Sequence, residues 1–260
     1  MAVYLRNGIT KPDSQLELID AKEILILNLM PNRAETERQF TRLFATLPGN
    51  VALTFAIPGT HQVKNQPALV YQHYARWPDL RDEYFHGLIV TGAPVDQLPL
   101  AQVTYWEEYV AILKWRLTHV AKSLFTCWGA FAAGVAEEVI AATQHSYKIT
   151  GVYTTNAITM PHSRYFSFPL DNAKIHVKAG TKSLGATWLF DETTHSTYLS
   201  GHLEYAADTL YQEYLRDQAK GLQPSLPENL LDAKGNPVQS WQVDAQQIFN
   251  EWLNKELTRN

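Results

Sequence analysis

The sequence predicts an α/β protein whose doubly wound, mostly parallel sheet is flanked by helices. Aliphatic runs of strand length alternate with amphipathic stretches of helix length through the first half of the chain. Several runs, such as 24-ILILNLM-30, are almost entirely apolar, which is typical of strands buried on both faces of a parallel sheet. We expect a single domain over 1–260, with a short N-terminal arm at about 1–22 and a C-terminal helical extension at about 222–260.

Four strands and four helices are expected before residue 145. The strands cover 23–31, 51–59, 86–94 and 123–126, and the helices cover 32–47, 67–74, 105–120 and a stretch from near Gly129. The first helix is predicted to bury residues at helical spacing, Phe40, Leu43, Phe44 and Leu47, and the third to bury Trp106, Val110, Leu113 and Leu117. Ligands bind such sheets at the carboxyl ends of the strands, which are here 91-TGAP-94 and 126-TC-127.

The second half is richer in short β segments, which we expect at 149–160, 173–181, 186–192 and 194–205. A loop is predicted at 161-PHSRYFSFP-169, between two prolines. A helix at 206–220 should end at Gly221, and an irregular segment rich in Pro, Gly and Asn follows. The last helix, 240–257, should bury its apolar face, Trp241, Ala245, Ile248, Phe249 and Trp252.

Composition argues against several classes of protein. The net charge of -4 and pI near 6.1 predict neither a nucleic acid nor an anionic membrane as partner. No run approaches a membrane span and the N-terminus has no signal-peptide core, so we expect a cytoplasmic protein. A single Cys allows no internal disulfide, and no metal-ligand spacing such as HExxH or CxxC occurs, so we expect no metal and no bound cofactor.

The single cysteine, Cys127, is the candidate nucleophile. It lies between a predicted strand and a helix rich in Gly and Ala, the setting of a nucleophile elbow. A helix N-terminus favours thiolate over thiol, and the amide of Trp128 is placed to donate to an oxyanion. Taken alone, a lone cysteine is more often a packing residue, so the hypothesis requires a base.

His202 is the candidate base, because it follows a predicted strand and precedes Glu204 by two residues. An extended backbone puts both side chains on one side, so the carboxylate can orient the imidazole toward a thiol. The alternative is a helix start at which Glu204 favours the helix dipole.

Together these segments resemble the homoserine O-acyltransferase family, the homoserine O-succinyltransferases and O-acetyltransferases of methionine synthesis, related in fold to class I glutamine amidotransferases. The matching segments occur in family order: LILNLMPNRAETERQF, GLIVTGAPVDQL with YWEEY, LFTCWGA, KITGVY, PHSRY, GHLEYAADTL, EYLRD and IFNEWLN. The resemblance implies a ping-pong reaction, in which Cys127 takes an acyl group from acyl-CoA and an amino acid hydroxyl attacks the thioester. His202 would be the base in both halves, oriented by Glu204. The family also suggests a homodimer.

Other positions match the family one at a time. Arg216 matches the substrate arginine, whose guanidinium suits a carboxylate, and Lys148 and Ser163 match substrate-contacting positions. Without the resemblance these would be a solvated helix charge, a surface lysine and a turn serine. By analogy of fold, amides near Gly92 and Ala93 would complete an oxyanion hole with Trp128.

The resemblance leaves the choice of substrates to a few positions. Asp96 stands where family members with glycine accept succinyl and those with an acidic side chain exclude it, so we expect acetyl-CoA rather than succinyl-CoA, although relatives usually carry the longer Glu. L-Homoserine is the default acceptor. L-Serine is an alternative, because the chain departs from the family at VYTT (152–155), GHLEY (201–205) and WQVD (241–244), near the expected acceptor site or subunit contacts.

Two further classes remain open at this point. A glutamine amidotransferase-like hydrolase or peptidase would use the same Cys-His-Glu arrangement without depending on CoA. A non-catalytic binding module would tolerate loss of triad residues, and all three are present.

Overall fold

The computed structural model describes residues 2–254 of the chain. Its main sheet runs in the order β1-β3-β2-β5-β6-β11-β10-β9, with the short β4 paired to β3. The strands of this sheet are β1 Val3–Leu5, β2 Lys22–Leu27, β3 Val51–Ile57, β4 Ala75–Arg76, β5 Gly87–Val90, β6 Ser123–Thr126, β9 His176–Thr181, β10 Gly185–Asp191 and β11 Ser196–Leu199. From β1 to β11 neighbouring strands are parallel, while β10 and β9 are added antiparallel. The expected doubly wound α/β architecture is confirmed.

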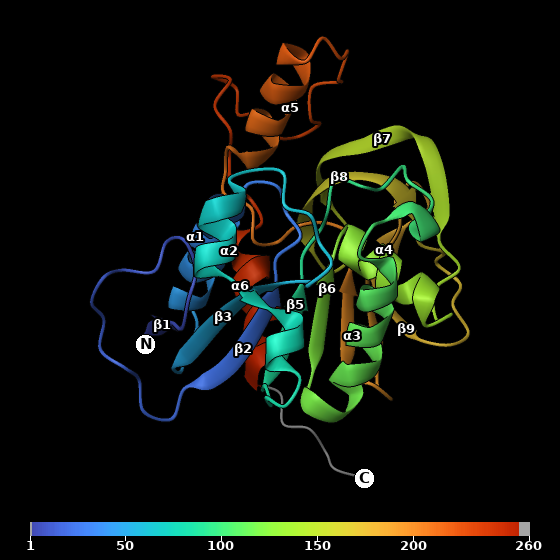
Figure 1. The fold of residues 1–260 in the computed structure, drawn as a ribbon. Helices are drawn as coiled ribbons and strands as arrows, with labels where there is room; N and C mark the ends of the chain where they lie inside the picture. Colours follow the sequence, from blue (N-terminus) through green and yellow to red (C-terminus); the bar gives the residue numbers. More distant parts are fainter. Residues whose placement is uncertain (1, 255–260) are drawn as a thin grey trace.

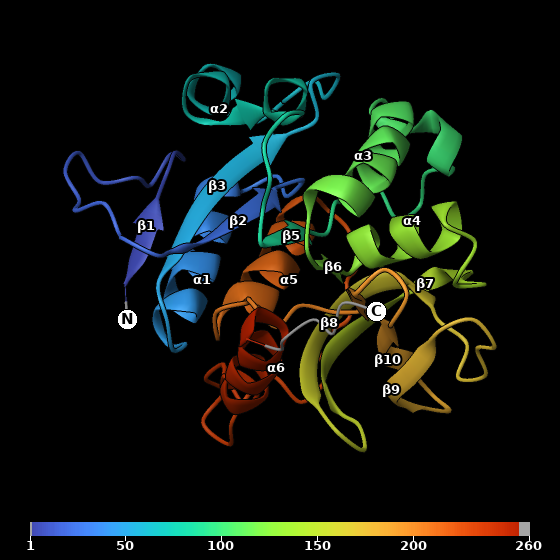
Figure 2. The same ribbon diagram turned by 90° about the horizontal axis from the view of Figure 1, so that it is seen from below.

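Helices cover both faces of the sheet, as Figures 1 and 2 show. The helices are α1 Arg33–Ala45, α2 Pro67–His73, α3 Trp106–His119, α4 Trp128–Ala136, α5 Thr209–Ala219 and α6 Gln242–Asn254, with short 3-10 turns η1 Trp77–Leu80 and η2 Leu100–Gln102. One core lies under α1 and α6, and a second lies under α3 and α4. No helix among residues 2–254 has the length and hydrophobicity needed to cross a membrane.

The chain ends contribute to the sheet and its core. β1 pairs with β3, so the expected N-terminal arm supplies an edge strand. The apolar face predicted for the last helix is buried, and Trp252 packs against Gly87 of β5 so closely that a Cβ there would lie 2.4 Å from its ring. The part of that predicted helix at 255–257 lies outside the described residues.

Two expectations about local structure were wrong. The predicted loop at 161–169 is largely strand β8, Thr159–Ser167, which pairs with β7, Thr143–Thr154, in a separate antiparallel ribbon. A two-stranded ribbon has only edge strands, so it tolerates Pro161, whose carbonyl accepts from the His202 amide at 2.9 Å. In α3 the buried face is instead formed by Tyr109, Ile112, Leu113 and Arg116.

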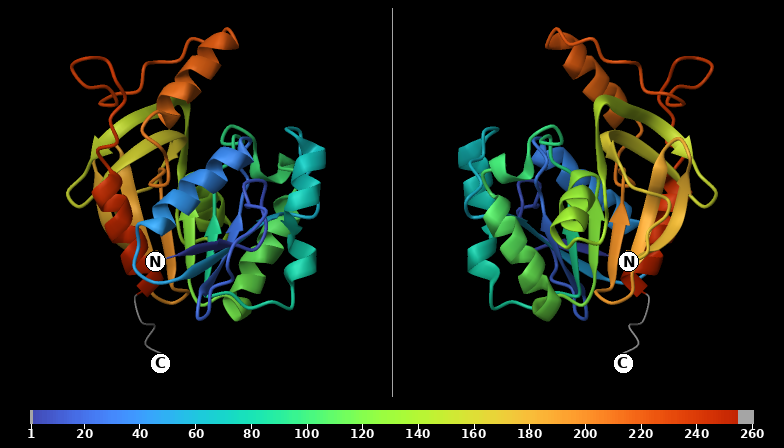
Figure 3. Two further views of the ribbon diagram at one scale, coloured as in Figure 1. Left: turned by 90° about the vertical axis from the view of Figure 1, so that its left-hand side faces the viewer. Right: turned by 90° about the vertical axis from the view of Figure 1, so that its right-hand side faces the viewer.

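The β7–β8 ribbon and α5 lie together beyond the carboxyl ends of the parallel strands (Figures 1 and 3). Neither belongs to the alternating pattern of the first half of the chain. Both face the turn after β6, and this is where the functional candidates meet.

Candidate active site

Cys127 occupies the sharp turn between β6 and α4. Its backbone has φ 48° and ψ −119°, in a region that residues with a side chain rarely adopt, as expected for a strained nucleophile elbow. Gly129 makes the turn possible, because a Cβ there would lie 2.7 Å from the Thr91 carbonyl oxygen and 2.8 Å from that of Val90. The sequence therefore places small residues where β5 and α4 approach one another.

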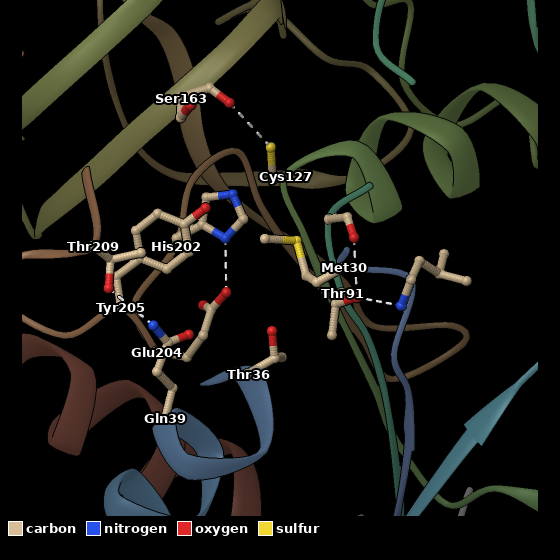
Figure 4. Close-up of polar contacts among 12 residues, drawn as sticks. Met30, Thr36, Gln39, Thr91, Cys127, Ser163, His202, Glu204, Tyr205 and Thr209 are labelled. Atoms are coloured by element: carbon tan, nitrogen blue, oxygen red, sulfur yellow. Dashed lines mark hydrogen bonds and ion pairs between the residues drawn. The ribbon is translucent and has the colours of Figure 1, made fainter. Parts of the chain in front are cut away.

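His202 and Glu204 form a buried pair beside the cysteine. His202 Nδ1 donates to Glu204 Oε1 at 2.7 Å, and both side chains are at most 2% exposed. This bond leaves Nε2 to face the thiol, as Figure 4 shows. Gly92 lies against both catalytic candidates, since a Cβ there would be 2.9 Å from His202 Cε1 and 3.3 Å from Cys127 Cβ.

Burial and neighbouring charges shift the pKa of both side chains. Burial raises the pKa of Cys127, although the neighbouring His202 and the Trp128 amide act against this. Burial also acts to lower the pKa of His202, but the Glu204 carboxylate and Cys127 outweigh it and raise that pKa well above its ordinary value. A base with a raised pKa thus lies beside the thiol, whose Sγ donates to the Ser163 carbonyl oxygen at 3.7 Å.

A cleft of about 450 Å³ opens above Cys127. It brings together most of the residues singled out from the sequence, namely Ala93, Asp96, Cys127, Lys148, Ser163, His202 and Arg216. Glu204 lies behind His202 and does not line the cleft. Residues from the loop after β5, from β7 and β8, and from α5 thus meet at the end of the sheet that the strand pattern predicted.

The loop after β5 is fixed by the Thr91 side chain. Thr91 Oγ1 accepts from the Leu29 amide at 2.8 Å and donates to the Gly92 carbonyl at 3.0 Å. Within residues 2–254, the amides of Gly92 and Ala93 donate no hydrogen bond. Neither amide thus has a partner among the described residues, which is a requirement of the oxyanion hole expected at this position.

Asp96 is a half-buried carboxyl in this cleft. Burial raises its pKa to about 7, with His202 and Lys148 acting in the opposite direction. One carboxyl oxygen, Oδ1, is shut off from solvent without a hydrogen-bond partner. A group in this state carries its charge at a cost, which is typical of functional rather than structural carboxylates.

Charged side chains of α5 and β7 form the opposite wall. Arg216 Nε and Nη2 both donate to Asp217 Oδ1, at 3.0 and 2.9 Å, and Lys148 Nζ lies 3.5 Å from Asp217 Oδ2. The Arg216 side chain is 47% exposed, so a ligand can reach its remaining donors. No three His, Cys, Asp or Glu side chains in the described part of the chain gather as ligands of a metal would.

Sequence reasoning missed two residues of the site, Tyr205 and Glu213. Glu213 accepts from Ser163 Oγ at 2.6 Å and from the Tyr205 hydroxyl at 2.7 Å. The Tyr205 ring is stacked on His202, with centroids 4.1 Å apart and an angle of 15° between the rings (Figure 4). The position of Glu213, three residues before Arg216 on one helix, was the available signal.

Comparison with known proteins shows the family of the chain. The sequence profile of the homoserine O-succinyltransferase family matches residues 7–259. A homoserine O-acetyltransferase of Leuconostoc mesenteroides is 40% identical over 271 residues, covering 97% of this chain and 88% of the relative. A homoserine O-acetyltransferase of Lactococcus lactis subsp. cremoris is 35% identical over 253 residues, covering 89% and 79%.

Among solved structures, the chain is similar in fold to a glutamine amidotransferase from Thermotoga maritima, with a TM-score of 0.58. The two share 9% sequence identity, and the match covers 93% of this chain and 100% of that one. This likeness concerns the fold alone, whereas the sequence relatives share most of their length with this chain. The chain belongs to the homoserine O-succinyltransferase family and is an acyltransferase.

Proposed function

We propose that the protein transfers an acetyl group from acetyl-CoA to the side-chain hydroxyl of L-homoserine through a thioester on Cys127. The observation that carries the proposal is the strained cysteine at the end of β6, with a buried His202–Glu204 pair beside it and a cleft of about 450 Å³ above it. The relatives' names supply the acyl group and the amino acid.

In the first half-reaction His202 takes the thiol proton and the sulfur attacks the carbonyl carbon of the donor. A C–S bond forms, the oxyanion receives hydrogen bonds from the amides of Trp128, Gly92 and Ala93, and the bond to CoA breaks. The CoA sulfur leaves with the proton held by His202. The acyl group then remains on Cys127.

In the second half-reaction the acceptor occupies the space that CoA vacated. Arg216 holds its carboxylate, and Lys148 and Ser163 line the same wall. His202 takes the proton of the acceptor hydroxyl, whose oxygen attacks the thioester carbon. The C–S bond breaks, and the thiolate recovers the proton from His202.

Asp96 supports acetyl rather than succinyl as the acyl group. An ionised carboxylate in the cleft repels the free carboxylate of succinyl-CoA and does not oppose the acetyl group. With its pKa at about 7, Asp96 is mostly neutral at pH 6 and mostly ionised at pH 8. We therefore expect discrimination against succinyl-CoA to weaken as the pH falls through 7.

The deciding experiment is intact-mass analysis after mixing the protein with acetyl-CoA alone. We expect an acetyl adduct that Cys127→Ala lacks, one equivalent of CoA released as the adduct forms, and further CoA release only after an amino acid acceptor is added. Measuring turnover with each pair of acetyl- or succinyl-CoA and homoserine or serine identifies both substrates. Faster turnover with succinyl-CoA would contradict the role of Asp96, and faster turnover with serine would make serine the acceptor. Glutamine hydrolysis without CoA would assign the site to a hydrolase instead.

A further inference from the structure

We propose that Tyr205 is a positioning residue, whose ring, fixed through its hydroxyl by Glu213, holds the His202 imidazole against Cys127 and favours its protonated form. The inference rests on the proposed chemistry at Cys127. The Tyr205 hydroxyl donates to Glu213 rather than to His202 or Cys127, so Tyr205 acts through the base that moves the proton.

The first observation is the stacked geometry of the two rings. Their centroids lie 4.1 Å apart and their planes differ by 15°, so the face of the phenol covers the face of the imidazole. Gly92 closes the Cε1 edge and Glu204 Oε1 holds Nδ1, which leaves only Nε2 directed toward the thiol. The imidazole is thus restrained on three sides, and the ring of Tyr205 supplies the restraint perpendicular to its plane.

The second observation is that Tyr205 is itself anchored at both ends. Its carbonyl oxygen accepts from Trp241 Nε1 at 3.2 Å and from Gln239 Nε2 at 3.1 Å. Its hydroxyl donates to Glu213 Oε1 at 2.7 Å, and the side chain is fully buried. A ring held in this way cannot move away when the imidazole gains or loses its proton.

The third observation is a continuous path from Tyr205 to the nucleophile. Glu213 Oε2 accepts from Ser163 Oγ at 2.6 Å, and the Ser163 carbonyl oxygen accepts from Cys127 Sγ at 3.7 Å. Glu213 of α5 therefore connects Tyr205, which is stacked on His202, to Ser163 of β8, which contacts Cys127. Contacts of α5 thus reach both sides of the catalytic pair.

An aromatic face also stabilises a cation stacked on it. The imidazolium that forms when His202 takes a proton therefore gains from Tyr205 as well as from Glu204. The titratable groups that face this imidazole from the surrounding elements are Glu204, Cys127, Asp96 of the loop after β5 and His162 of β8. All of them remain unchanged in a Tyr205 variant, so a change in the pH profile reports on the ring.

The test measures thioester formation with acetyl-CoA alone, by rapid-mixing detection of released CoA between pH 5.5 and 9. Tyr205→Leu removes the ring, and we expect a rate between about tenfold and a hundredfold lower, with the pH profile moved toward lower pH because the imidazole holds its proton less tightly. Tyr205→Phe keeps the ring but loses the bond to Glu213, so we expect a smaller loss of about three- to tenfold.

Tyr198 provides a matched control. Its hydroxyl also donates to a glutamate, Glu137 Oε2, at 2.8 Å, and its buried ring is stacked on Phe125 rather than on the catalytic base. Tyr198→Phe should leave the rate and the pH profile as in the wild type. If Tyr205→Leu does not fold, the comparison of Tyr205→Phe with Tyr198→Phe decides the question.

Glu213→Gln tests the anchoring step. We expect it to slow thioester formation by about the same factor as Tyr205→Phe, because both changes remove the hydrogen bond between Tyr205 and Glu213. For the same reason the double variant should be no slower than the slower of the two single variants. Wild-type rates and pH profiles in the Tyr205 variants would overturn the inference and leave the proposed thioester on Cys127 intact. Absence of the adduct in the wild type would instead overturn the proposed function.

Discussion

Replacing Asp96 by Asn should stabilise the protein above pH 7 and leave it unchanged at pH 4. The pKa of this carboxyl is raised by burial from 3.8 to about 7, so the folded protein binds its proton more tightly than the unfolded chain does. Stability associated with Asp96 is therefore fully present below pH 3.8 and is lost as the pH rises to about 7.

The size of the effect follows from the same gap. The pKa of Asp96 differs by about three pH units between the folded and the unfolded protein, and one unit corresponds to about 1.4 kcal/mol. The upper bound on the change in the free energy of unfolding is therefore about 4 kcal/mol. Because the cleft is open to water, we expect about half of this, a gain of about 2 kcal/mol for Asp96→Asn at pH 8. For a chain of this size, that corresponds to a rise of roughly 5 °C in Tm.

The assay is thermal and urea unfolding of the wild type and Asp96→Asn at pH 4, 6 and 8. Asp13→Asn, on the exposed N-terminal segment, controls for the general effect of removing one negative charge. Equal stability of the Asp96 variant and the wild type at pH 8 would refute the reasoning, as would a gain of the same size at pH 4. The variant should also accept succinyl-CoA better than the wild type does at pH 8.

Two further substitutions test the packing around the site and far from it. Gly92→Ala places a Cβ 2.9 Å from His202 Cε1 and 3.3 Å from Cys127 Cβ, and Glu204 and Tyr205 hold the imidazole in place. We therefore expect thioester formation at least about tenfold slower and a lower Tm; a wild-type rate would contradict this contact. Glu137→Gln removes the anion paired with Arg116, which is 1% exposed, so urea unfolding should show a loss of about 3 kcal/mol while the rate of thioester formation is retained.

Part of this protein can be read from the order of its residues. A continuous aliphatic run needs burial on both faces, so the runs between amphipathic segments predicted the parallel sheet. The helical spacing of apolar residues predicted the face that α1 buries. The Cys127 turn and the His202–Glu204 pair were also predictable, because strand ends, small residues and a two-residue spacing are local properties.

Other features depend on contacts between segments far apart in the chain. β8 was predicted as a loop because the segment 161–169 lies between two prolines, yet His162 and Arg164 are fully buried, and the Arg164 guanidinium donates to the Leu184 carbonyl at 2.9 Å. In α3 the stripe with Trp106 and Leu117 was chosen for its hydrophobicity. The fold instead buries Arg116, because Glu137 and Ser196 supply its partners.

The sequence by itself determined which residues are candidates for the chemistry, since a nucleophile, a base and a carboxylate are recognised by their type and local spacing. Only the tertiary structure decided how they are held. Glu213 carries only the local signal of its helical spacing from Arg216, and Tyr205 carries none, because their place in the site arises when α5, β8 and the loop after β11 meet beyond the sheet. The physical reason is that burial, stacking and charge pairing are properties of neighbours in space, which the alternation of polar and apolar residues does not encode.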